Sequence, residues 1–122
     1  MQMPVDLTDD TVEQISLTDL AATLRAGPEY DANGRTAQTL AKGPGMSVML
    51  GVVAAGTQLD EHAAPGPVVL TVVDGRLAFV SGEGERELGA GDAVAFAGNV
   101  RHTVRGIDDA AFLLVITQGG EG

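Results

Sequence analysis

The chain has 122 residues, a formal net charge of −10 and no cysteine. A chain of this length builds one domain around one hydrophobic core. The acidic balance repels phosphate backbones and anionic lipid surfaces, so we expect neither nucleic acid nor a membrane among the partners. The lack of cysteine excludes disulfides, thiolate metal ligands and a cysteine nucleophile.

The first fifteen residues are acidic and have neither the basic start nor the apolar stretch of a signal peptide. The longest apolar runs of the chain are as short as strands, far below the ~20 residues that a membrane-spanning helix needs. We therefore expect a soluble, cytoplasmic protein. Within this region the run Thr-Val-Glu-Gln-Ile at 11–15 predicts a short strand.

The next segment predicts one short amphipathic helix. Its apolar residues recur at helical spacing: Leu17, Leu20, Ala21 and Leu24. Ser16 with Asp19 three residues later forms a variant of the capping box, and Gly27-Pro28 stops the helix. We expect residues 1–34, with this strand and helix, to form an N-terminal extension that belongs to the same domain as residues 35–122.

From residue 35 onward, short apolar or alternating runs are separated by Gly, Pro, Asn and Asp. Eight runs predict strands, at 35–42, 46–54, 67–74, 76–81, 85–89, 93–97, 101–106 and 111–118. Strands of this length and spacing indicate an antiparallel sandwich or barrel, so the predicted fold class is all-β. Asp74-Gly75, between two of the runs, predicts a β-hairpin with a type I′ turn.

Two of the predicted strands, 67–74 and 111–118, are apolar on both faces. One face of each would line the barrel. The other would pack on the helix, on a second sheet or on another subunit. We therefore expect a homodimer.

The two histidines of the chain, His62 and His102, follow glycine turns in two separated segments. In the first, Gly56, five further residues, His62 and then Gly75 keep a fixed spacing. In the second, "GAGDAVAFAGNVRH", Gly91 and His102 mark the two ends. Over residues 46–118 this arrangement resembles the two sequence motifs of the small single-domain cupins.

The resemblance implies a cupin barrel, also called a double-stranded β-helix or jelly roll. In the second motif Ala97 and Asn99 stand where the family has proline and glycine. Fold alone does not determine function, so the site positions have to be compared one by one.

In metal-binding cupins the ligands are two histidines and an acid from the first motif and a histidine from the second. The resemblance therefore places His62 and His102 at two ligand positions and Ala64 and Val68 at the other two. Alanine and valine have no lone pair to donate to a cation, so half of the family's ligands are missing. Asp60 lies on the same strand face as His62 and is the acid that could join the pair.

We expect His62 and His102 to form the polar end of a mostly apolar pocket. Its predicted members are His62, His102, Val68, Leu70, Val72, Val94, Phe96 and Val104. Pockets of this kind are typical small-molecule sites. Burial and proximity would keep both imidazoles neutral, and a neutral imidazole can act as a general base.

Three functions stay open at this point. The first is a barrel that binds a small molecule without a tightly bound metal and with little or no catalytic activity. The second is a metal-dependent oxygenase or isomerase in which His62, His102 and water, substrate or Asp60 hold zinc, nickel, iron or manganese. The third is a structural or interaction module whose barrel is filled by its own side chains. No residue is assigned as catalytic.

Overall fold

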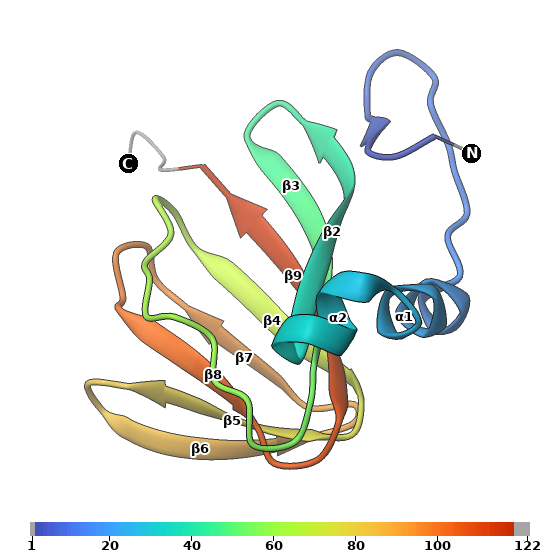
Figure 1. The fold of residues 1–122 in the computed structure, drawn as a ribbon. Coiled ribbons are helices and arrows are strands. Elements are labelled where there is room, and N and C mark those ends of the chain that lie inside the picture. The colour runs from blue at the N-terminus through green and yellow to red at the C-terminus, as the bar shows by residue number, and fades with distance from the viewer. Residues whose placement is uncertain (1, 119–122) are drawn as a thin grey trace.

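The structure is a computed structural model that describes residues 2–118. Its strands form two sheets that face each other (Figure 1). The six-stranded sheet has the order β1 (Val5–Asp6), β2 (Arg35–Gly43), β3 (Met46–Val53), β9 (Ala110–Thr117), β4 (Val68–Asp74), β7 (Ala93–Phe96). The three-stranded sheet has the order β6 (Gly84–Gly89), β5 (Arg76–Ser81), β8 (His102–Gly106). This all-β jelly roll confirms the predicted fold class, and β2 to β9 match the eight predicted strands to within about two residues.

The corner between β4 and β5 is not the hairpin predicted at Asp74-Gly75. β4 pairs with β7 and β9, whereas β5 pairs with β6 and β8, so the chain passes from one sheet to the other here. Of the two corner residues only Gly75 has a positive φ, 75°. A Cβ atom on Gly75 would collide with the carbonyl oxygen of Asp109. The prediction was wrong because long-range strand pairing, and not the local turn signal, decides where β5 lies.

The N-terminal strand also lies elsewhere than predicted. Residues 11–15 have no strand partner, and Val12 is 89% exposed. The strand is β1, whose Val5 is buried and pairs in parallel with Ala41 of β2. The prediction at 11–15 was wrong because β-propensity forms no strand where no sheet edge is in reach.

The helix α1 (Leu17–Arg25) confirms the amphipathic prediction. The Ser16 side chain accepts a hydrogen bond from the Asp19 backbone N–H at 3.2 Å, as expected of the N-cap. After Gly27, a second helix that was not predicted, α2 (Pro28–Asn33), begins. Proline fits the first position of a helix because the N–H that it lacks has no partner there, so Pro28 ends one helix and starts the next.

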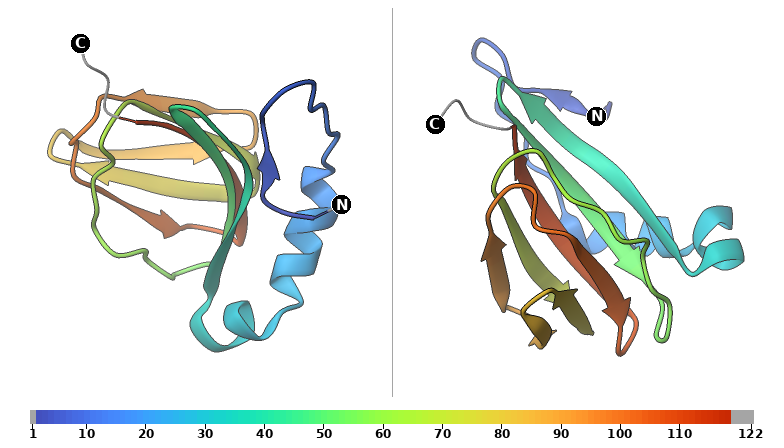
Figure 2. Two further views of the ribbon diagram at one scale, coloured as in Figure 1. Left: turned by 90° about the horizontal axis from the view of Figure 1, so that it is seen from above. Right: turned by 90° about the vertical axis from the view of Figure 1, so that its left-hand side faces the viewer.

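The helices cover part of the outer face of the six-stranded sheet, beside β2 and β3 (Figure 2). The buried residues of this layer are Ala21, Leu40, Leu50, Val52 and Ala111. A second core lies between the sheets and contains Leu70 and Val72 from one sheet with Leu77, Phe79 and Val104 from the other. No helix among residues 2–118 is long and apolar enough to span a membrane.

Candidate functional site

His62 and His102 are cross-strand neighbours at the open end of the barrel. The segment 55–62 runs beside β8 and is tied to it by isolated bridges. In the last of these, the His62 N–H donates to the His102 carbonyl at 3.0 Å and the His102 N–H donates to the His62 carbonyl at 2.9 Å. The two ring centroids lie 4.4 Å apart at an interplanar angle of 61°.

Each imidazole has a backbone carbonyl as the partner of its Nδ1 atom. Nδ1 of His62 is 3.1 Å from the Asp60 oxygen, and Nδ1 of His102 is 3.0 Å from the Val100 oxygen. A carbonyl oxygen only accepts hydrogen bonds, so each Nδ1 carries the proton. In the neutral ring the lone pair is then on Nε2, which makes both side chains acceptors toward a ligand.

The two histidines differ in their surroundings. His62 is exposed, whereas His102 is only 4% exposed and its ring packs on Phe79 and Phe96, at centroid distances of 5.4 and 4.6 Å. Burial lowers the pKa of His102, and the hydrogen bond to the Val100 carbonyl opposes this only partly. His102 is therefore neutral at neutral pH.

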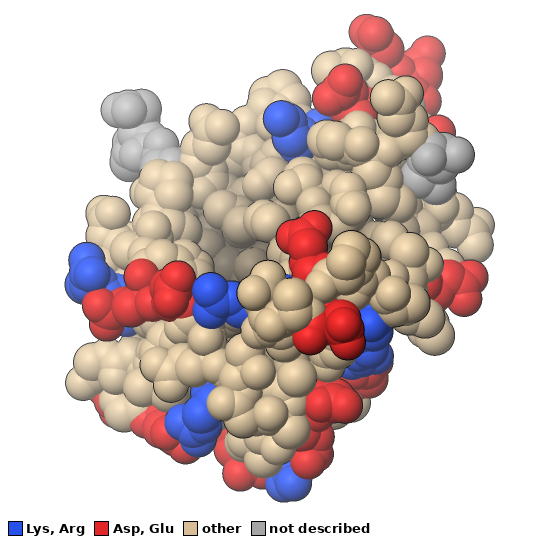
Figure 3. Space-filling view, viewed as in Figure 1, with Lys and Arg blue, Asp and Glu red and all other residues tan. Residues whose placement is uncertain are grey.

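A cavity of about 390 Å³ opens beside the two rings. Its other lining residues are apolar: Ala37, Met49, Leu59, Ala64, Pro65, Val68, Phe112, Leu114 and Ile116. Among the described residues His62 and His102 are the only polar side chains in this lining. Figure 3 shows an uncharged hollow on this face of the molecule, with charged side chains along its lower border.

The structure brings three of the predicted pocket residues together, His62, His102 and Val68. The other five lie elsewhere. Leu70, Val72 and Val104 are each at most 2% exposed and belong to the closed core below the cavity, and Val94 and Phe96 line a groove outside it.

The prediction missed the wall that β9 contributes. Phe112, Leu114 and Ile116 point into the cavity. These three residues alternate along the strand, but the residues between them are apolar as well. The alternation therefore did not indicate which face of the strand lines the barrel. The position of β9 between β3 and β4 decides this.

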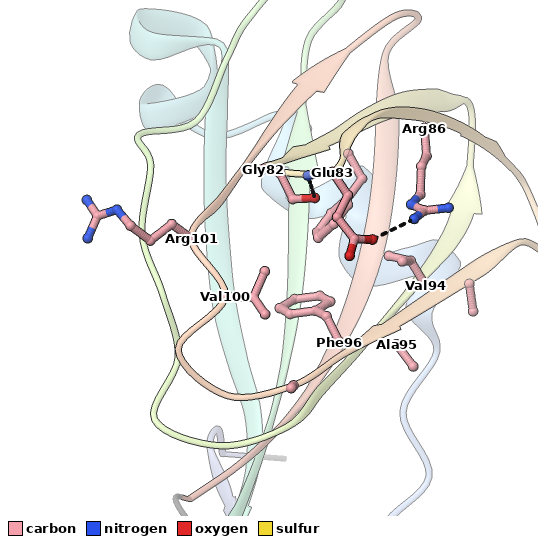
Figure 4. A pocket seen from close by; sticks show the side chains of 12 residues that line it. Gly82, Glu83, Arg86, Val94, Ala95, Phe96, Val100 and Arg101 are labelled. Atoms are coloured by element: carbon pink, nitrogen blue, oxygen red, sulfur yellow. Dashed lines mark hydrogen bonds and ion pairs between the residues drawn. The ribbon is translucent and has the colours of Figure 1, made fainter.

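The groove outside the cavity has a volume of about 760 Å³ and runs between β7 and the turn of the β5–β6 hairpin (Figure 4). Phe96 and Val94 lie on its β7 side. The side chains of Glu83 and Arg86 on the hairpin point toward each other, 3.4 Å apart. Arg101 points away from the groove and binds Glu61 at 3.0 Å.

Asp60, the acid that was expected to join the two histidines, lies apart from the cavity. The Asp60 side chain is 93% exposed, and its carboxylate lies 3.5 Å from the Arg35 guanidinium. Ala64 and Val68 occupy the cavity wall. Within residues 2–118 no group of three or more His, Cys, Asp or Glu side chains is arranged to hold a metal ion.

A comparison with known protein families identifies the family of this barrel. A sequence model described as the cupin domain matches residues 49–117, more than half of the chain. The chain belongs to the cupin family. This confirms the resemblance carried by the two histidine segments, and the matched part of the cupin runs from β3 to β9.

Solved structures show the same cupin fold. A conserved protein of unknown function from Streptococcus pyogenes, SPY1581, has a TM-score of 0.71 at 14% identity, covering 100% of this chain and 98% of that one. KdgF from a Halomonas species has a TM-score of 0.62 at 17% identity, and the match covers 70% of this chain and 82% of KdgF. Salicylate 1,2-dioxygenase from Pseudoaminobacter salicylatoxidans, in adducts with gentisate, has 0.70 at 18%, covering 82% of this cupin but only 31% of the dioxygenase. At such identities the likeness shows the fold alone. A search of curated proteins finds no match.

Proposed function

We propose that this cupin binds a small, uncharged, mostly apolar molecule in the cavity beside His62 and His102. The observation that carries the proposal is the lining itself, in which two imidazoles are the only polar side chains among the described residues. A volume of about 390 Å³ lies in the range of small-molecule pockets.

The lining also favours one class of ligand. Both imidazoles have their Nδ1 protons bound to backbone carbonyls, so in the neutral ring the lone pair is on Nε2, which can then accept from an O–H or N–H group. No lysine or arginine lines the cavity in the described part of the chain, and the protein carries a net charge of −10. A phenol or an alcohol fits these conditions, whereas a carboxylate would enter an apolar site without a counter-ion.

We propose further that the site holds no tightly bound metal. Catalytic metal sites use about three protein ligands and one open position, whereas this cavity offers two imidazoles. Ala64 and Val68 have no donor atom, and the Asp60 carboxylate faces Arg35. The residues present therefore do not fit a catalytic metal centre.

A thermal-shift screen of phenols, alcohols, sugars and carboxylic acids tests the ligand class. A ligand at ~100 times its Kd should stabilise the fold by about 2.7 kcal/mol. We expect phenols or alcohols to stabilise the wild type and His62→Ala to lose most of this gain. If no compound stabilises the protein, the barrel is a structural or interaction module, and if only carboxylates do, the proposed ligand class is wrong.

Elemental analysis tests the metal proposal. The full chain, purified without an affinity tag or added metal, should contain far less than one equivalent of zinc, nickel, iron or manganese. About one equivalent that disappears in both His62→Ala and His102→Ala would overturn the proposal and favour the metal-dependent enzyme.

A further inference from the structure

We propose that the ligand of the cavity beside His62 and His102 is an aromatic molecule with hydroxyl groups on two neighbouring ring carbons, as in catechol. The inference rests on the proposed function, because it names the ligand class of the same site. Three features of the cavity carry it: two matching imidazole acceptors, a lining that is otherwise apolar in the described part of the chain, and an aromatic wall.

The backbone holds the two imidazoles in the same way. In each histidine, Nδ1 lies close to the carbonyl oxygen two residues earlier in the chain, at 3.1 Å from Asp60 for His62 and at 3.0 Å from Val100 for His102. The backbone N–H of each histidine also donates to the carbonyl of the other. On each ring Nε2 points away from the carbonyl that binds Nδ1. The pair therefore presents two equivalent lone pairs.

These two acceptors are neighbours without partners. The ring centroids are 4.4 Å apart, and neither Nε2 atom has a hydrogen-bond partner among residues 2–118. Two neutral rings of this tautomer cannot satisfy each other, because both Nε2 atoms only accept. A ligand with one hydroxyl group pairs with one ring and displaces water from the other, which is costly. Hydroxyl groups on neighbouring carbons donate to both rings at once.

The rest of the lining favours an aromatic ring over a sugar. A sugar has further hydroxyl groups, and these would lose water without gaining a partner from the apolar wall. The ring of Phe112 lines the cavity and lies directly on Gly51, where a Cβ atom would be only 2.5 Å from its Cζ atom. A ring held in this way offers a fixed surface for a second aromatic ring.

Calorimetric titration of the full, untagged chain with four phenols tests the proposal. The protein is treated with EDTA to exclude chelation of a metal by catechol, and oxygen is removed to keep catechol reduced. Catechol should bind with a Kd at least ~10-fold below that of phenol, which corresponds to about 1.4 kcal/mol. 2-Methoxyphenol, which lacks one donor, and 1,3-dihydroxybenzene, whose hydroxyl groups lie further apart, should both bind like phenol.

A variant tests whether the second hydrogen bond goes to His62. His62→Phe keeps a ring at the mouth of the cavity and removes one acceptor, so catechol should bind it no more tightly than phenol does. Val12→Phe adds a ring at a position that is 89% exposed and absent from the cavity lining, and it should keep the preference for catechol. Thermal melting checks that the variants are folded, and His62→Leu replaces His62→Phe if the latter is not.

The outcomes separate this inference from the proposed function. If catechol and phenol bind the wild type equally well, or if 1,3-dihydroxybenzene binds more tightly than catechol, the paired-donor ligand is wrong and the small-molecule site stands. A preference for catechol that survives in the folded His62 variant, or that occurs only when EDTA is omitted, also overturns the inference. If none of the four phenols binds, the proposed ligand class falls together with it.

Discussion

The two ends of the barrel interior use the same strands for different purposes. Along β4, Leu70 and Val72 are about 1% exposed in the core, whereas Val68 borders the cavity. Along β8, Val104 belongs to the core and His102 to the cavity. A shift of two residues along one strand face thus separates a position that stabilises the fold from one that can contact a ligand. The difference teaches that the closed end holds the barrel together while the open end is available for binding.

Removing packing at the closed end should have the largest effect. Leu70→Ala deletes a fully buried side chain and should lower the free energy of unfolding by about 2–5 kcal/mol. Urea unfolding measures this. Val69→Ala, on the same strand but 41% exposed, should cost clearly less. Equal losses at the two positions would mean that the closed end is not the stabilising core.

Adding volume near the cavity should have a smaller effect. A Cβ atom on Gly51 of β3 would lie 2.5 Å from Cζ of Phe112, whose ring lines the cavity. Gly51→Ala should therefore displace the ring, cost about 1–3 kcal/mol and weaken ligand binding. Gly82→Ala meets no atom within 4 Å and is the matched control. If Gly51→Ala unfolds like the wild type, the ring moves without strain.

Acid should destabilise the open end through His102. Burial lowers the pKa of His102 from 6.5, so below this value the unfolded chain binds a proton that the folded protein resists. The contribution is fully present above 6.5 and is lost as the pH falls through the folded pKa. Urea midpoints at about pH 7.5 and 5.5 should differ in the wild type, and His102→Gln should reduce the difference. If His102→Gln shows the same difference between the two urea midpoints as the wild type, the pH dependence comes from groups other than His102.

The smallest change in stability is expected at the exposed histidine. His62→Ala should alter the free energy of unfolding by no more than about 0.5 kcal/mol, since the side chain is exposed and its loss leaves no buried cavity. The same urea experiment measures it. A loss as large as that of Leu70→Ala would show that the open end also supports the fold.

The sequence predicted where the strands lie along the chain better than it predicted which strands pair with one another. Alternation and turn residues located β2 to β9, and Ser16 located the start of α1. These signals are local. At Gly75 the local signal indicated a hairpin, but β5 pairs with β6 and β8 in the three-stranded sheet, whereas β4 belongs to the six-stranded sheet. Strand order depends on which apolar faces meet over long distances in the sequence, and local alternation and turn signals do not reveal it.

The candidate site was predictable at its polar end and not in its lining. Motif spacing located His62 and His102, and the structure makes them cross-strand neighbours. The predicted lining followed strand parity alone, so it included Leu70 and Val104, which face inward but lie too deep. Parity gives the face of a strand, whereas depth along the barrel depends on its tilt and register.

The position of β9 has a consequence for how the chain folds. β9 is the last strand among the described residues 2–118, yet it lies between β3 and β4 and is hydrogen-bonded to both. During synthesis β3 and β4 therefore emerge before the strand that lies between them. The edge of each strand that faces β9 stays unpaired until residue 117 has left the ribosome. Because long-range strand pairing slows folding, we expect this protein to fold slowly for a chain of its size.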